Sequence, residues 1–151
     1  MNVIILGCGR IGSTLARSFD KEGHKVTVID QKTEALKRLG SDYTGTTIVG
    51  NGIDQEVLKR AGIEKADAFV AVTAGDNTNI MSVQIAKERF KVKKVITRIY
   101  DPIRACAYRE LGIETICTTI IGAKLIKDYL LDKKWGEAAD YCALSGDEIE
   151  I

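Results

Sequence analysis

Three glycines near the start of the chain have the spacing of a phosphate-binding turn. Gly7, Gly9 and Gly12 follow an apolar run short enough for one buried strand, and a helical pattern begins at the last of them. In such a turn the first glycine allows a sharp change of direction, the second allows the backbone to approach a pyrophosphate, and the third allows the helix to pack closely on the strand. The helix amino terminus then directs N–H groups at the phosphates. The predicted phosphate site comprises Gly7, Cys8, Gly9, Arg10, Ile11 and Gly12.

An acidic residue follows at the distance expected for a ribose ligand. Asp30 ends a second β-branched run and lies close to the usual spacing of about 20 residues after the turn. A carboxylate there accepts hydrogen bonds from the ribose hydroxyls of an adenosine, and its charge disfavours NADP because it would repel the 2′-phosphate. A compatible alternative is that Asp30 caps the next helix. We include the neighbouring Gln31 in the candidate site.

Three further segments place polar or small residues at predicted strand ends, where open α/β sheets bind their ligands. Asn51 and Gly52 are candidates for an adenosine pocket, although a plain turn would explain them equally well. Thr73 and Ala74 follow an apolar strand and would lie beside the glycine turn if the strand order reverses there. Arg98 lies near the end of another strand, where contact with a phosphate or carboxylate explains a cation better than packing does.

Apolar runs alternate with helical patterns along most of the chain. The expected strands cover residues 3–6, 25–29, 46–49, 68–72, 95–99 and 114–117. Six strands alternating with six helices predict a Rossmann-like, doubly wound parallel α/β sheet in the order 3-2-1-4-5-6. The wholly apolar fourth strand should be central, and Ile11, Leu15 and Phe19 should form the buried stripe of the first helix.

A C-terminal crossover helix is expected from residue 120 to about residue 131. Its apolar stripe is wide enough to indicate burial against something larger than the sheet edge. We predict one nucleotide-binding domain over residues 1–132. Residues 133–151 are expected to be a linker or the start of a truncated C-terminal domain, because the alternation at 145–151 is typical of a strand whose partner is missing.

Composition excludes several classes of function. Lysine and arginine total 22 against 21 acidic residues, so a net charge of +1 provides no field that favours nucleic acid, and any anion site must be local. The apolar runs are too short to span a membrane, and no signal peptide is recognised. Four cysteines without a Cys-x-x-Cys pair, with a single histidine, predict no metal site and reduced thiols in a cytosolic protein. Cys8 could have a lowered pKa beside a helix amino terminus, but packing is the favoured role.

Five short motifs at the expected strand ends occur together in this chain. They are Gly-Cys-Gly-Arg-Ile-Gly at 7–12, Val-Ile-Asp at 28–30, Gly-Asn-Gly at 50–52, Val-Thr-Ala-Gly-Asp-Asn-Thr-Asn at 72–79 and Thr-Arg-Ile-Tyr-Asp at 97–101. In combination they resemble the TrkA amino-terminal family, the KTN or RCK regulatory domains of bacterial potassium transporters and channels. The resemblance covers residues 1–132.

The resemblance implies a non-enzymatic regulatory subunit that binds NAD(H) or an adenine nucleotide (ATP, ADP or AMP). It also implies a homo-oligomer, a dimer or a larger ring, peripheral to the inner face of the cell membrane under an integral membrane potassium-translocating subunit. By position, Thr73 and Ala74 would form the floor of the crevice, and Arg10 would reach the nucleotide of a neighbouring subunit. Many relatives have Pro-Glu where this chain has Thr119 and Ile120, so we do not predict divalent-cation binding there.

Two other functions compete with this one. A small NAD-dependent oxidoreductase, or a fragment of one, would use the same fold, but it also needs a substrate region and an acid or base. The single histidine, His24, is expected in a turn away from the crevice. A structural dimerisation module with a vestigial site is the third alternative.

Overall fold

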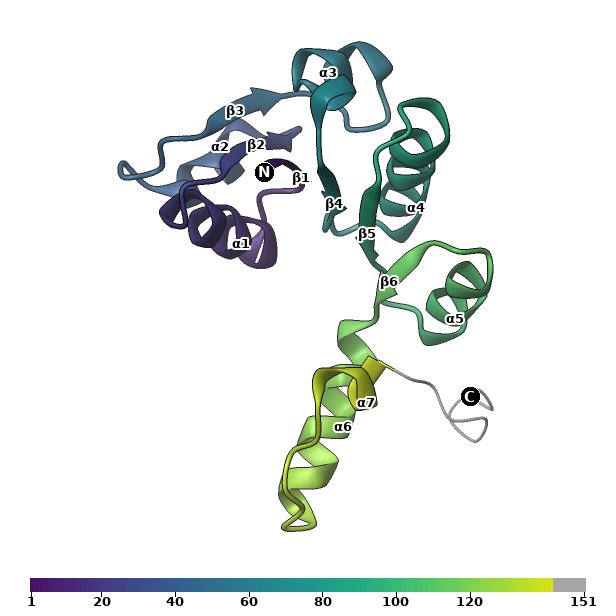
Figure 1. Cartoon of the computed structure of the whole chain (residues 1–151). Coiled ribbons are helices and arrows are strands. Elements are labelled where there is room, and N and C mark those ends of the chain that lie inside the picture. Colours follow the sequence, from purple (N-terminus) through teal and green to yellow (C-terminus); the bar gives the residue numbers. More distant parts are fainter. Residues whose placement is uncertain (143–151) are drawn as a thin grey trace. The chain divides into compact units, whose positions relative to one another are not determined.

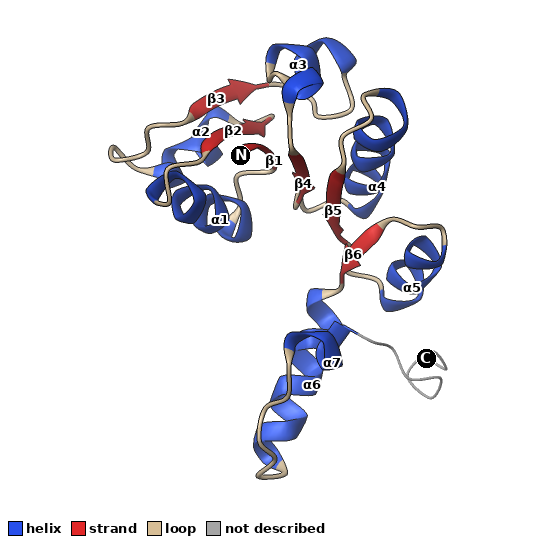
Figure 2. Cartoon of the chain, viewed as in Figure 1, coloured by secondary structure: helices blue, strands red, loops and turns tan. Residues whose placement is uncertain are grey.

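The computed structural model describes residues 1–142, and it has the predicted alternation of strands and helices (Figures 1 and 2). The strand order is β3-β2-β1-β4-β5-β6, and strands β1 to β5 pair in parallel, which confirms the predicted doubly wound sheet. The alternation at residues 145–151 lies outside the described residues. The strands are β1 (Asn2–Leu6), β2 (Lys25–Asp30), β3 (Thr46–Val49), β4 (Ala68–Ala71), β5 (Lys94–Arg98) and β6 (Glu114–Ile116).

Helices follow the strands along the chain. They are α1 (Arg10–Lys21), α2 (Thr33–Leu36), α3 (Gln55–Arg60), α4 (Asp76–Gln84), α5 (Pro102–Glu110), α6 (Thr118–Leu130) and α7 (Ala138–Cys142). Asp54 caps α3 by accepting a hydrogen bond from the Glu56 N–H, and Asp101 caps α5 in the same way. Helix α2 continues as a 3₁₀ turn (Lys37–Leu39), and α4 continues as a π-helical turn (Ile85–Arg89).

The chain divides into two compact units, residues 1–97 and 98–151, at a point inside β5. In the first unit β4 pairs with both β1 and β5, so the prediction that it is central is confirmed. One face of the sheet packs α1 through Gly12, Ser13 and Ala16. The expected stripe is correct for Leu15 and Phe19, which pack against this core.

The expected burial of Ile11 is wrong, because this side chain is 40% exposed. The face of α1 that packs on the strand consists of the small residues Gly12, Ser13 and Ala16. Ile11 precedes Gly12 by one residue, so its side chain is rotated by about 100° around the helix axis from that of residue 12. The small buried residues let the helix approach β1 closely, so the first turn of α1 lies directly beyond the end of that strand.

Strand register aligns the carboxyl ends of the central strands. Leu6 is opposite Ile29 of β2 and Ala71 of β4, while Asp30 is opposite Val49 of β3. The residues that leave these strands therefore lie along one edge of the sheet. All of the predicted site residues except Arg98 belong to this edge of the first unit.

In the second unit, the segment after α6 folds back on that helix. The Tyr141 hydroxyl donates a hydrogen bond to Asp128 (3.1 Å) and accepts one from the Gly136 N–H (2.8 Å). Helix α7 was not predicted, because five residues are too few for a periodic pattern. Among the described residues of α6, Ile120 alone is buried, whereas Ile126, Tyr129 and Leu130 are 64%, 72% and 71% exposed.

We expect Tyr141→Phe to loosen this fold-back without unfolding the first unit. The ring keeps its packing, but two hydrogen bonds are lost, each with a net contribution of about 1 kcal/mol. Hydrogen exchange should rise in residues 133–142 and stay unchanged in residues 1–97. Tyr129→Phe, at an exposed tyrosine on α6, is the matched control. Unchanged exchange in Tyr141→Phe would contradict the assignment.

Candidate functional site

The glycine turn between β1 and α1 has a shape that side chains would prevent. Gly7 has a φ of +100°, and its N–H donates to the Ile29 carbonyl at 2.8 Å. A Cβ atom on Gly12 would collide with the Gly7 carbonyl oxygen. Since that oxygen belongs to the backbone, a larger residue at position 12 would move the start of α1 away from β1.

The amino terminus of α1 presents unsatisfied donors to the edge of the sheet. The Ser13 N–H bonds the Gly9 carbonyl at 2.9 Å, so the N–H groups of the three preceding residues have no acceptor within the helix. A Cβ on Gly9, the N-cap of this helix, would meet nothing within 4 Å, so the space beside the N-cap is open. The first helical residue is the exposed Arg10, and the first turn of this fully described helix contains no acidic residue.

A cation at this position is unfavourable in the isolated domain. A positive side chain at a helix amino terminus opposes the macrodipole by about 0.3–1 kcal/mol. A bound anion reverses that sign, because it interacts favourably with both the dipole and the guanidinium group of Arg10. The terminus therefore has the electrostatics of an anion site.

Asp30 connects β2 to the glycine turn. Its Oδ2 accepts a hydrogen bond from the Cys8 N–H at 2.7 Å, and its Oδ1 accepts one from the Lys32 N–H at 2.9 Å. The expectation that Asp30 caps the next helix is wrong, because the N-cap of α2 is Lys32. The carboxylate instead fixes the turn, and each oxygen keeps a lone pair that can accept from a ligand hydroxyl.

Cys8 contributes only its backbone to this edge. Its side chain is fully buried in the core, and burial, together with the nearby Asp30 carboxylate, raises the pKa of the thiol. The alternative of a lowered thiol pKa is therefore wrong, and the favoured packing role is confirmed. The reason is the direction of the side chain, which points into the sheet rather than toward the helix terminus.

The loop after β3 lies against the end of β1. A Cβ on Gly52 would collide with the side chain of Leu6, so any larger residue there would require Leu6 to move. Asn51 is exposed, and its Oδ1 accepts a weak turn bond from the Ile53 N–H at 3.2 Å. The turn bond explains part of the choice of asparagine, and the Nδ2 group of Asn51 has no protein partner among the described residues.

The loop after β4 contacts the glycine turn, as expected from the order of the strands. A Cβ on Gly7 would lie 2.9 Å from the Thr73 nitrogen. Thr73 is held by Asn79, whose Oδ1 accepts from the Thr73 N–H (2.9 Å) and hydroxyl (2.7 Å) and whose Nδ2 donates to the Thr73 carbonyl (3.0 Å). The exposed Ala74 follows directly.

Sequence reasoning did not include Asn79 in the site, although it is fully buried and sets the position of Thr73. A usable signal was available. Asparagine is a poor helix former, so an asparagine within the first turns of α4 needs a hydrogen-bonding reason.

The two remaining predicted residues differ in their surroundings. Gln31 is exposed immediately after β2, next to Asp30. Arg98 begins the second unit, where it is half-buried with its guanidinium carbon 4.2 Å from the centre of the Tyr100 ring. This cation–π contact gives Arg98 a packing partner that the sequence did not reveal.

Within residues 1–142, no three His, Cys, Asp or Glu side chains lie close enough together to hold a metal ion. In the same part of the chain, no helix combines the length and the apolar character needed to cross a bilayer.

The strand order and the glycine turn define a Rossmann-like α/β domain, with its candidate site at the carboxyl edge of the sheet. Comparison with known proteins gives the family. Residues 3–119 match the model of the TrkA-N domain, and the chain belongs to that family.

A curated relative supports this assignment at the level of sequence. This chain is 49% identical to the Trk system potassium uptake protein TrkA of Streptomyces coelicolor over 118 residues, which are 78% of this chain. The aligned part is 53% of that protein, so the chain spans about half the length of the curated relatives it matches.

Solved structures support the fold. The Shewanella denitrificans Kef CTD in its AMP-bound form has a TM-score of 0.72 at 20% identity, covering 94% of this chain and 86% of that one. The GsuK RCK domain structure has a TM-score of 0.74 at 20% identity, covering 87% of this chain and 28% of that one.

We expect Gly12→Ala to destabilise the domain more than Gly9→Ala. Gly12→Ala should lower the free energy of unfolding by about 1–3 kcal/mol, because its Cβ meets backbone. Gly9→Ala has open space and should cost less than about 1 kcal/mol, the effect of alanine at an N-cap. Urea denaturation measures both. Equal losses in the two variants would contradict the close packing described for Gly12.

Proposed function

We propose that the chain is the nucleotide-binding part of a regulatory subunit of a potassium uptake system. The observation that carries this proposal is the bond from the Cys8 N–H to Asp30, at 2.7 Å. It ties a ribose-type carboxylate to a phosphate-type turn, at the edge where this fold binds ligands. Membership of the TrkA-N family and the similarity to a Trk system potassium uptake protein support the biological role.

The ligand is NAD(H) or an adenine nucleotide: ATP, ADP or AMP. The donors at the start of α1 suit phosphate, Asp30 suits the ribose hydroxyls, and the exposed Asn51 suits an adenine edge. Thr73 and Ala74 form the floor beside Gly7. An AMP-bound Kef CTD shares the fold, which supports a nucleotide without selecting one.

The domain acts without catalysis, as a homo-oligomer, a dimer or a larger ring, in the cytoplasm. Its partner is an integral membrane potassium-translocating subunit, and nucleotide exchange gates that partner by changing the shape of the assembly. The exposed apolar side chains of α6 support an interface with another copy, because a monomer rarely leaves such a stripe in water. Arg10 at the exposed helix terminus supports contact with a neighbour's nucleotide. Arg98 is our candidate for contact with the phosphates or the far half of a dinucleotide.

We expect Asp30→Ala to weaken nucleotide binding by more than about 1 kcal/mol, because a hydrogen bond to a charged group contributes about 1.5–3 kcal/mol. Calorimetry with NADH, NAD, ATP, ADP and AMP measures the loss. Because alanine also releases the Cys8 N–H, Asp30→Asn is included, since it keeps an acceptor oxygen while removing the charge. Asp42→Ala, at an exposed acid of the same unit, is the matched control. Unchanged affinity in Asp30→Ala would refute the ribose assignment.

We expect Arg10→Ala to reduce nucleotide-linked assembly while leaving the fold intact, because the side chain is exposed at the end of its helix. Sedimentation velocity with and without nucleotide measures the effect. Arg17→Ala, an exposed arginine further along α1, should behave like the wild type. If Arg10→Ala and the wild type sediment identically in both conditions, Arg10 has no role between subunits.

A further inference from the structure

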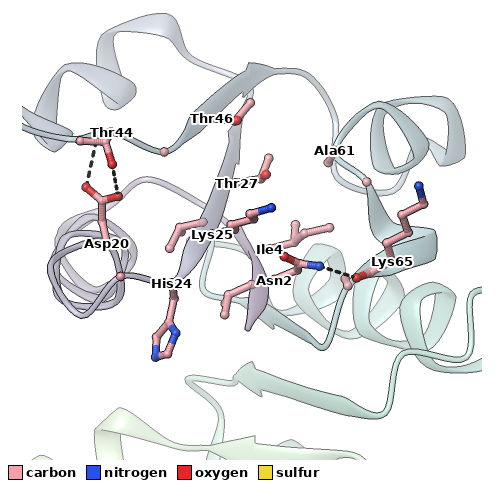
Figure 3. Close-up of a pocket in the computed structure, with 16 residues that line it drawn as sticks. Asn2, Ile4, Asp20, His24, Lys25, Thr27, Thr44, Thr46, Ala61 and Lys65 are labelled. Carbon is pink, nitrogen blue, oxygen red and sulfur yellow. Dashed lines mark hydrogen bonds between the residues drawn. The ribbon is translucent and has the colours of Figure 1, made fainter.

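A cavity lies at the amino-terminal ends of the first three strands, at the opposite edge from the glycine turn (Figure 3). Its volume is about 570 Å³, within the range of small-molecule sites. It is lined by Asn2, Ile4, Lys25, Thr27, Thr44, Thr46, Ala61 and Lys65, among others. Because Asn2 begins β1 and Leu6 ends it, the cavity and the turn are separated by about 13 Å of strand.

The polar groups of the cavity are mostly donors. Among the described residues, the ammonium groups of Lys25 and Lys65 and the hydroxyls of Thr27 and Thr46 have no ion pair or hydrogen bond to other protein groups. Figure 3 shows the Lys25 side chain extending beside Thr27 and Ile4. Thr27 is opposite Thr46 in the β2–β3 register, and Lys25 lies two residues before Thr27 on the same face of the sheet. These three groups suit an oxyanion, while Lys65 lies across the cavity and adds positive charge (Figure 3).

The single acid of the lining does not neutralise these lysines by direct contact. Asp20 accepts hydrogen bonds from the Thr44 N–H (2.9 Å) and hydroxyl (2.7 Å), and these bonds lower the pKa of its carboxyl. Figure 3 shows this pair at one side, away from Lys65. Its bonds with Thr44 connect α1 to the segment before β3, so its role in the cavity is structural.

We propose that this cavity binds a small phosphate ester, with Lys25 and Lys65 balancing its charge and Thr27 and Thr46 donating to its oxygens. A phosphate ester carries a charge of about −1.5 to −2 at pH 7. This charge matches the two ammonium groups better than the single charge of a monocarboxylate ligand would. The buried Ile4 and Ala61 provide an apolar surface for the organic part. Such a site would give the domain a second ligand, independent of the nucleotide.

An NMR titration of the ¹⁵N-labelled chain with glycerol 3-phosphate tests the proposal. Saturable shifts are expected at the amides lining the cavity, with none from glycerol. Lys25→Gln combined with Lys65→Gln should weaken binding at least tenfold while AMP still binds. Lys21→Gln combined with Lys93→Gln changes the charge equally at exposed lysines outside the cavity and should change affinity less than twofold.

Thr27→Val combined with Thr46→Val removes the two hydroxyls but keeps the β-branched shape that strands favour. This variant should fold normally and bind glycerol 3-phosphate more weakly than the wild type. The proposal is overturned if shifts occur only at residues 7–12, if both lysine double variants respond equally, or if malonate binds as tightly as the phosphate ester. If the wild-type chain binds glycerol 3-phosphate at the cavity but does not bind AMP, that result counts against the proposed nucleotide site and leaves this proposal standing. Loss of AMP binding in the lysine double variant alone would contradict the independence of the two sites.

Discussion

The contact between Gly12 and the Gly7 carbonyl is the constraint on which the candidate nucleotide site depends. Because no Cβ separates them, α1 begins directly against the end of β1. That position places the first N–H groups of the helix, and Arg10, at the carboxyl edge of the sheet. Asp30 then holds the turn through the Cys8 N–H, and Asn79 holds the neighbouring loop through Thr73. The backbone of the turn and of the neighbouring loop is therefore held in place by these hydrogen bonds before any ligand arrives. This lowers the entropy cost of ordering the site on binding.

The two edges of the sheet differ in chemistry. The carboxyl edge combines helix N–H groups with a carboxylate, a pairing that suits a molecule bearing both phosphate and hydroxyl groups. The amino edge has lysines and threonines around an apolar floor and no comparable carboxylate free to accept. If both edges bind ligands, they report on different molecules through the same short strands, and β1 and β2 are the physical connection between them.

The sequence was sufficient for the order of the strands because each apolar run was bounded by residues with a definite local role. Asp54 and Asp101 cap the helices that follow β3 and β5, and the apolar β4 was central as predicted. It was insufficient where one position along a helix or the direction of one side chain decided the outcome. Ile11 lies one residue from the buried face, Cys8 points inward, and Asp30 binds backbone rather than capping α2. Long-range partners such as Asn79 for Thr73, and short elements such as α7, leave no periodic signal.

The central claim is that the glycine turn and Asp30 form a nucleotide site in the folded domain. A ligand that binds only the native state raises the free energy of unfolding, and the increase grows with the logarithm of the ligand concentration divided by the dissociation constant. A thermal-shift series with NADH, NAD, ATP, ADP and AMP measures this directly, with NADP as the comparison. The account predicts a concentration-dependent rise in Tm for at least one of the five and a smaller rise for NADP, because Asp30 repels the 2′-phosphate. No rise with any of the five, or the largest rise with NADP, would contradict it.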